Sequence, residues 1–121
     1  WDAFLARHAA ARGKAFETGV LCKSKRGRDV EKGVFGCLGD PKRTMLVSAR
    51  HHCSESVASY VLEGFLEAVL AADEVGEWYR ANVAVMAVPF MDKDGVLFPV
   101  MEEYHRDVLG VPVWYLPAGG A

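Results

Sequence analysis

The chain has 121 residues and a mass of 13.3 kDa, the size of one ordinary domain, and 51% of its residues are apolar. This composition excludes a long disordered segment, and the net charge of −2 excludes nucleic acid and an anionic membrane as expected main partners. Three cysteines are too few for a disulfide framework, which indicates a reduced chain in the cytoplasm.

The first half of the chain is predicted to form a short helix, a β-hairpin and a third strand. Apolar residues at helical spacing predict a helix over residues 2–12. Alternation predicts a strand over 16–22, and a basic turn at 23–28 joins it to a second strand over 28–38. The basic residues of this hairpin are expected to form a solvated surface. The apolar segment 44–49 is bounded by charge, which is typical of a strand buried on both faces.

The second half alternates helices with strands. Apolar residues repeat at helical spacing over 54–72, where Ser54 is a suitable N-cap and Glu55 suits the first turn. The remaining expected elements are a helix over 74–80, a strand over 83–90, a turn at 92–95, a helix over 100–110 and a strand over 111–116. This alternation indicates βαβ units, and therefore an α/β fold with a mixed, largely parallel sheet and flanking helices.

The residues best placed for chemistry lie between the strand 44–49 and the helix that follows it. In parallel α/β sheets, ligands collect at the carboxyl ends of strands. His52 and Glu55 are three residues apart at this junction, so their side chains can converge on one metal ion, and both are ordinary zinc ligands. Two other interpretations remain open. Glu55 can complement the helix dipole, and His52 can be a capping or hydrogen-bonded histidine.

Three segments in order, within residues 17–96, resemble the zinc carboxypeptidases. Around the His-x-x-Glu pair, the form Arg50-x-His52 is more similar to the cytosolic and bacterial branch of this family than to the secreted branch. The supporting segments are Ser24-x-x-Gly27-Arg28 upstream and Val88-Pro89-Phe90-Met91-Asp92-x-Asp94-Gly95 downstream. The resemblance implies the N-terminal part of a carboxypeptidase domain.

The resemblance also implies an activity. His52 and Glu55 would bind zinc, and a zinc-activated water would hydrolyse the C-terminal peptide or amide bond of a peptide substrate. Arg50 is close enough for a substrate-binding role. The chain departs from the family at Asp92 and Lys93, which replace Asn and Pro. The substrate-binding arginines, the third zinc ligand and the general-base Glu have no counterpart. Residues 1–121 are therefore expected to form a single, incomplete catalytic domain that is weak or inactive alone.

Two alternatives to a carboxypeptidase remain open. In the first, the chain is a non-catalytic α/β remnant or assembly subunit, and a second chain completes its sheet by covering an open edge. In the second, Glu102 and His105 share a helix at a spacing that suits metal ligation, and this pair faces His52 and Glu55 in a carboxylate-bridged site for two metal ions. A solvated helix face explains Glu102 and His105 equally well.

Overall fold

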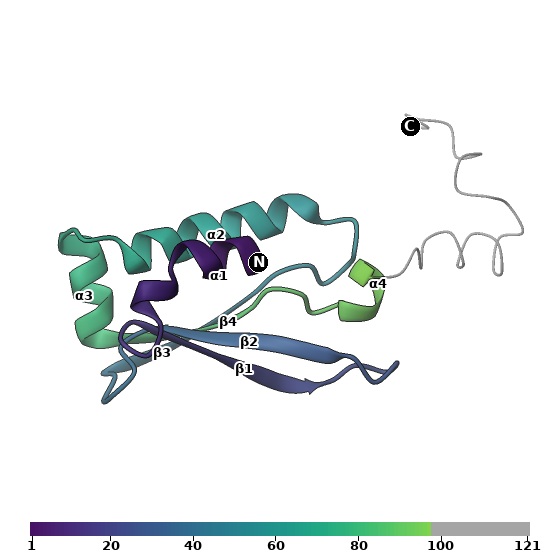
Figure 1. Cartoon of the computed structure of the whole chain (residues 1–121), viewed down its shortest axis with the longest axis horizontal. Helices are drawn as coiled ribbons and strands as arrows, with labels where there is room; N and C mark the ends of the chain where they lie inside the picture. The colour runs from purple at the N-terminus through teal and green to yellow at the C-terminus, as the bar shows by residue number, and fades with distance from the viewer. Residues whose placement is uncertain (98–121) are drawn as a thin grey trace, which may run out of the picture.

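A four-stranded mixed sheet organises residues 1–97, the part of the chain that this computed structural model describes (Figure 1). The strands are β1 (Phe16–Lys23), β2 (Asp29–Gly36), β3 (Arg43–Ser48) and β4 (Val83–Val88), in the sheet order β1-β2-β4-β3. The helices are α1 (Asp2–Arg7), a 3-10 turn (Ala9–Ala11), α2 (Ser56–Leu70), α3 (Glu74–Asn82) and α4 (Lys93–Leu97).

The pairing of the strands confirms a mixed α/β fold. β3 and β4 are parallel and are joined through α2 and α3, which is the βαβ unit that the sequence predicts. The pairs β1–β2 and β2–β4 are antiparallel. Among the described strands, parallel pairing is therefore less frequent than expected. The β1–β2 pair is the predicted hairpin, since so short a turn joins only antiparallel strands, and this hairpin joins the βαβ unit through an antiparallel contact of β2 with β4.

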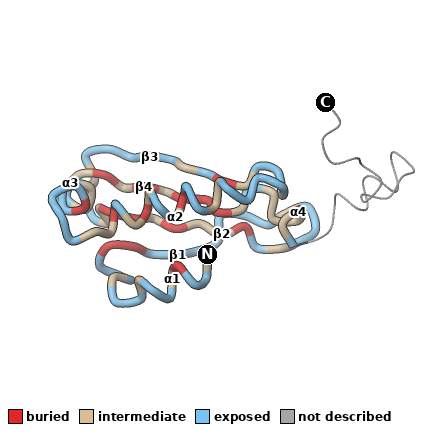
Figure 2. Tube along the Cα trace, turned by 90° about the horizontal axis from the view of Figure 1, so that it is seen from above, coloured by how far each residue is buried: buried red, intermediate tan, exposed pale blue. Residues whose placement is uncertain are grey.

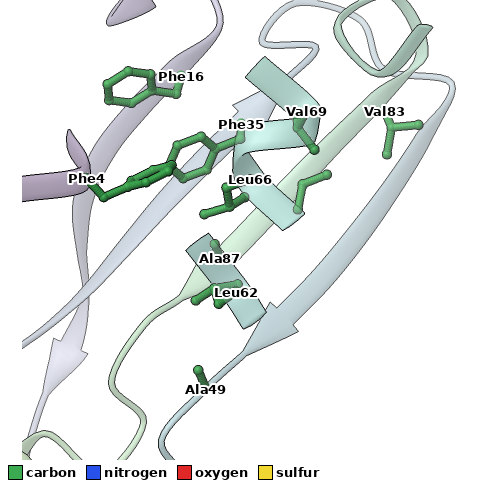
Figure 3. Packing of buried hydrophobic residues seen from close by; sticks show 10 residues of the cluster. Phe4, Phe16, Phe35, Ala49, Leu62, Leu66, Val69, Val83 and Ala87 are labelled. Atoms are coloured by element: carbon green, nitrogen blue, oxygen red, sulfur yellow. The ribbon is translucent and has the colours of Figure 1, made fainter. Parts of the chain in front are cut away.

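The hydrophobic core lies between one face of this sheet and the helices α1 and α2 (Figures 1 and 3). Phe4 of α1 packs beside Phe16 and Phe35, which come from β1 and β2. The part contributed by α2 and β4 contains small and branched apolar residues, namely Leu62, Leu66, Val69, Val83, Val85 and Ala87. Helical spacing on α2 and alternation on β4 place these residues on the facing sides of the two elements.

The expectation that the strand 44–49 is buried on both faces is wrong. β3 is the last strand of the sheet that the structure describes, and most of its residues are exposed (Figure 2). Leu46 is 63% exposed and Met45 is 41% exposed. An apolar strand is buried on both faces only where layers cover both sides of the sheet. Within residues 1–97, the helices α1 and α2 cover one side.

Several element ends also differ from the prediction. The first α-helix stops at Arg7, and a 3-10 turn continues it. Helix α2 begins at Ser56 with Glu55 at the N-cap and no side-chain cap, so Ser54 does not cap it. The expected turn at 92–95 is mostly the short helix α4, because the Asp92 carboxylate accepts a hydrogen bond from the Gly95 N–H. The predicted helix 100–110 and strand 111–116 lie outside the described residues. None of the helices in residues 1–97 has the length and apolar character needed to cross a membrane.

Candidate metal site

The candidate site lies where the parallel strands β3 and β4 both end. The two loops that follow these strands are hydrogen-bonded to each other, from Met91 N to Ala49 O at 3.0 Å and from Asp92 N to Arg50 O at 2.8 Å. The ladder between the strands therefore continues into the loops. This contact holds the residues after β3 next to those after β4, at the carboxyl edge of the sheet where α/β proteins bind ligands.

His52 and Glu55 are in direct contact in the loop that leads into α2. The distance from His52 Nδ1 to Glu55 Oε1 is 2.8 Å, and the His52 backbone N–H donates to Glu55 Oε2 at 3.2 Å. Both side chains are open to solvent, with His52 79% exposed and Glu55 45% exposed. The structure therefore brings the two predicted ligands together on an accessible surface. Their binding of a metal stays a prediction.

The contact between the two side chains changes the affinity of each for a proton. The pKa of His52 is raised, first by its hydrogen bond to the Glu55 side chain, then by the negative charge of Glu55, with a smaller contribution from Asp92. The pKa of Glu55 is lowered, mainly because its carboxylate accepts hydrogen bonds from the His52 side chain and backbone. The pair therefore holds a proton on the imidazole at a pH where a free histidine has lost it.

This contact predicts how His52 titrates. In the full chain, the NMR titration midpoint of the His52 ring is expected above the ordinary value near 6.5, and Glu55→Gln is expected to move it down. The Glu67→Gln variant is the matched control, because Glu67 faces His8 at a distance of 2.9 Å, away from the site. A His52 midpoint that does not change in Glu55→Gln contradicts the contact.

The same raised pKa determines the pH dependence of metal binding. A metal binds the neutral imidazole, so the proton on His52 must leave first. Above the raised pKa, His52 Nδ1 and the Glu55 carboxylate no longer share a proton, and an imidazole and a carboxylate side by side are a suitable zinc donor set. Residues 1–97 contain no cluster of three His, Cys, Asp or Glu side chains able to hold a metal ion. Glu102 and His105, the alternative further ligands, lie outside the described residues.

The partly buried side chain of Arg50 stabilises the same loop. Its backbone has a positive φ of 54°, which is uncommon for a residue other than glycine. Its guanidinium group donates to the Cys53 carbonyl through Nε at 3.1 Å, and to the Ser59 hydroxyl through Nη1 at 3.3 Å. Arg50 therefore ties the loop to the first turns of α2. Its predicted role in substrate binding stays a prediction.

The neighbouring histidine has a different partner. His51 Nε2 lies 2.8 Å from the Ser48 hydroxyl, at the end of β3, while His52 contacts Glu55. The two side chains are thus engaged separately, as expected for adjacent residues that leave a strand.

A polar cluster beside the site was missed by the sequence analysis. Asp94 of α4 accepts hydrogen bonds from the Ser24 hydroxyl at 2.8 Å, the Arg26 N–H at 3.0 Å and the Arg28 guanidinium group at 2.7 Å. Partial burial opposes ionisation of Asp94, but these hydrogen bonds outweigh it and lower its pKa. The expectation of a fully solvated basic hairpin is therefore wrong at Arg28. Both partners stood in segments that carried the family resemblance, although no local signal pairs residues so far apart.

Solved carboxypeptidase structures share the fold of the described residues. A protein assigned as a carboxypeptidase from Burkholderia mallei superposes with a TM-score of 0.64 at 23% identity, covering 78% of this chain and 25% of that one. A protein assigned as a carboxypeptidase A from Shewanella denitrificans gives 0.63 at 26% identity, covering 74% and 24%. A metallo-carboxypeptidase from Burkholderia cenocepacia gives 0.59 at 22% identity, covering 78% and 26%. The chain therefore has a carboxypeptidase fold over about a quarter of such a domain.

Sequence similarity leads to the same class of protein. The chain is 36% identical over 52 residues to cytosolic carboxypeptidase 4 from Mus musculus, and equally to its counterpart from Homo sapiens. These matches cover 43% of this chain but only 5% of the relatives. No protein-family model matches the sequence. The resemblance to the metallo-carboxypeptidases is confirmed, and it concerns a small part of the complete relatives.

Proposed function

We propose that this chain carries the first half of a zinc carboxypeptidase site, with His52 and Glu55 as two of the metal ligands. The observation that carries the proposal is the 2.8 Å contact between His52 Nδ1 and Glu55 Oε1. This contact lies at the carboxyl ends of two parallel strands, in a fold shared with carboxypeptidases. The name of one structural neighbour, a metallo-carboxypeptidase, supports a metal as the cofactor.

The proposed chemistry is hydrolysis of the C-terminal peptide or amide bond of a peptide substrate. Bound zinc supplies a water molecule of lowered pKa and polarises the carbonyl group. His52 and Glu55 hold the metal, and both must be deprotonated to do so. Arg50 holds the loop that bears them, and its proposed role is to bind substrate. The cytosolic carboxypeptidase relatives support a cytoplasmic location.

We further propose that the chain alone hydrolyses peptides poorly. The two ligands in residues 1–97 bind zinc weakly, because structural and catalytic zinc sites use at least three protein ligands. The exposed strand β3 favours a second candidate function, a non-catalytic subunit whose sheet is completed by another chain. Efficient C-terminal peptide hydrolysis that His52→Ala abolishes would exclude this candidate and show that the site is complete.

Zinc binding tests the proposal directly. Calorimetric titration of the purified chain with zinc at pH 7.5 is expected to show one site. We expect His52→Ala to weaken binding by at least about tenfold, because one of two donors is lost. His8→Ala is the matched control, since His8 also lies beside a glutamate, with His8 Nε2 at 2.9 Å from Glu67 Oε2. Circular dichroism checks that each variant is folded. Equal zinc affinity in wild type and His52→Ala would refute the metal role.

A further inference from the structure

Three segments lie at the edge of the sheet where the candidate metal site is found. They are the turn of the β1–β2 hairpin, the loop that leads from β4 into α4, and the loop after β3 that bears the two proposed ligands (Figure 1). The segment from β4 into α4 contacts both of the others. Contacts that fix this middle segment can therefore also fix the loop after β3.

Two ion pairs of opposite direction tie α4 to the hairpin. Lys93 Nζ lies 2.5 Å from Glu31 Oε1 of β2, and Asp94 Oδ1 lies 2.7 Å from Nη1 of Arg28. Helix α4 thus provides one cation and one anion, and the hairpin provides one of each in return. A shift of α4 that exchanged the partners would set like charges together, so the two pairs together define one docked position.

Lys93 is enclosed more completely than lysines usually are. Its side chain is 11% exposed, and its ammonium group also lies 5.2 Å from the centre of the Phe90 ring. A cation withdrawn from water in this way needs a carboxylate partner, and Glu31 provides it. Lys93 is also one of the positions at which the chain departs from the carboxypeptidase segment, where a proline stands. The Lys93–Glu31 pair is therefore a feature of this chain and not of that segment.

The middle segment also holds Arg50 in its unusual backbone conformation. Arg50 has a φ of 54°, and its carbonyl oxygen accepts a hydrogen bond from Asp92 N at 2.8 Å. Backbone of this kind persists only where the surrounding contacts over-determine it. Asp92 is itself fixed to α4, because its carboxylate accepts a hydrogen bond from the Gly95 N–H at 2.9 Å. The position of α4 is thereby transmitted to Arg50, two residues before His52.

We propose that the Lys93–Glu31 ion pair positions the metal site, by keeping the loop after β3 in its metal-binding conformation. The inference rests on the proposed function, because it concerns the geometry of the same two ligands. Lys93 is a positioning residue, which acts through α4 and the hydrogen bond from Asp92 to Arg50. Ligands that are already held in place lose little freedom on binding, so they bind a metal more tightly than the same side chains in a mobile loop.

A positioning pair and a purely stabilising pair differ in what their loss does to the folded protein. Loss of a stabilising pair lowers the resistance to unfolding and leaves the folded site as it is. Loss of a positioning pair also opens the folded protein locally. The local reporters are the N–H groups of Met91 and Asp92, here called the crossing amides, which donate to the loop after β3. Their exchange with solvent can be measured without any metal.

Amide exchange by NMR on the complete chain tests the positioning. Lys93→Glu sets a second carboxylate against Glu31. It is expected to speed exchange of the crossing amides at least about tenfold relative to the amides of β4, which report global unfolding. The double variant Lys93→Glu, Glu31→Lys restores opposite charges and is expected to restore the wild-type rate. Lys23→Glu is the matched control and is expected to change nothing, because it reverses the same charge in a pair with Asp29 inside the hairpin.

Zinc titration of the same variants connects the positioning with the proposed function. Lys93→Glu is expected to weaken zinc binding by roughly threefold to tenfold, and the double variant is expected to restore it. Absence of zinc binding in wild type, with the exchange results as expected, means that the proposed function fails and the positioning stands. Zinc binding that depends on His52, with no effect of Lys93→Glu on exchange or affinity, means that the positioning fails and the function stands.

Two further results contradict the inference. One is exchange of the crossing amides that rises only as much as exchange in β4, because the pair then stabilises the fold without positioning the loop. The other is a double variant that exchanges as fast as Lys93→Glu, because the effect then does not depend on the pair. Lys93→Gln removes the charge without adding repulsion, so it serves if Lys93→Glu does not fold, and it is expected to show a smaller change in the same direction.

Discussion

Phe35→Ala is expected to lower the free energy of unfolding by about 3–5 kcal/mol, the usual cost of removing a buried aromatic ring. The Phe35 side chain is 0% exposed and joins the two halves of the core. Its ring stacks on Phe16 at a centroid distance of 5.2 Å and lies 6.1 Å from the ring of Phe4 (Figure 3). Removing it leaves a cavity between α1 and the sheet. A domain of this size is stable by only about 5–15 kcal/mol, so the loss is a large fraction of the total.

Urea unfolding of wild type and variant, monitored by circular dichroism, measures this loss. Phe65→Ala is the matched control, because the Phe65 ring is only half-buried and packs edge-on against Tyr79 at the rim of the core. Its cost is expected to be clearly smaller. Equal costs for the two variants would mean that the core is not centred on Phe35.

Gly36→Ala is expected to destabilise the protein by about 2–5 kcal/mol, the sum of backbone strain and overpacking. Gly36 has a φ of +92°, a conformation that residues with a side chain rarely adopt. A Cβ atom there would lie 2.4 Å from the backbone oxygen of Val83 and 3.4 Å from that of Tyr79. Neither oxygen can move easily. Val83 O accepts a hydrogen bond from Cys37 N, and Val83 begins the central strand β4.

Thermal unfolding of Gly36→Ala measures the effect, and Gly39→Ala is its control. Gly39 lies three residues further along the same connection, with open space where its Cβ would be. Its replacement is expected to change stability by less than about 0.5 kcal/mol. A tolerated Gly36→Ala would show that the close approach of β2 to the start of β4 is wrong.

The position of the candidate site depends on packing contacts that lie outside it. The core residues of β3, β4 and α2 set the loop after β3 beside the loop after β4, and Arg50 ties that loop to α2. On the other side, Asp94 fastens α4 to the β1–β2 hairpin through Ser24 and Arg28. The fold therefore orients the His52–Glu55 pair from both strand ends, although the pair itself is exposed to solvent.

The features that depend on neighbours along the chain follow from local sequence patterns. Helical spacing located α2, and alternation located β1. The short basic turn after β1 made β1 and β2 a hairpin. His52 and Glu55 lie three residues apart after β3, with His52 in the loop and Glu55 at the N-cap of α2. This short spacing brings their side chains together. These features involve contacts of short range, which composition and spacing control directly.

The features that depend on distant partners become visible in the folded chain alone. The apolar sequence of residues 44–49 fits a central strand and an edge strand equally well. The neighbours of β3 in the sheet determine which of the two it is, and therefore how exposed it is. Likewise, nothing near Arg28 in the sequence indicated that its guanidinium group would meet Asp94. Burial and long-range pairing are properties of the assembled sheet, so the periodicity of a single segment predicts the element but not its partner.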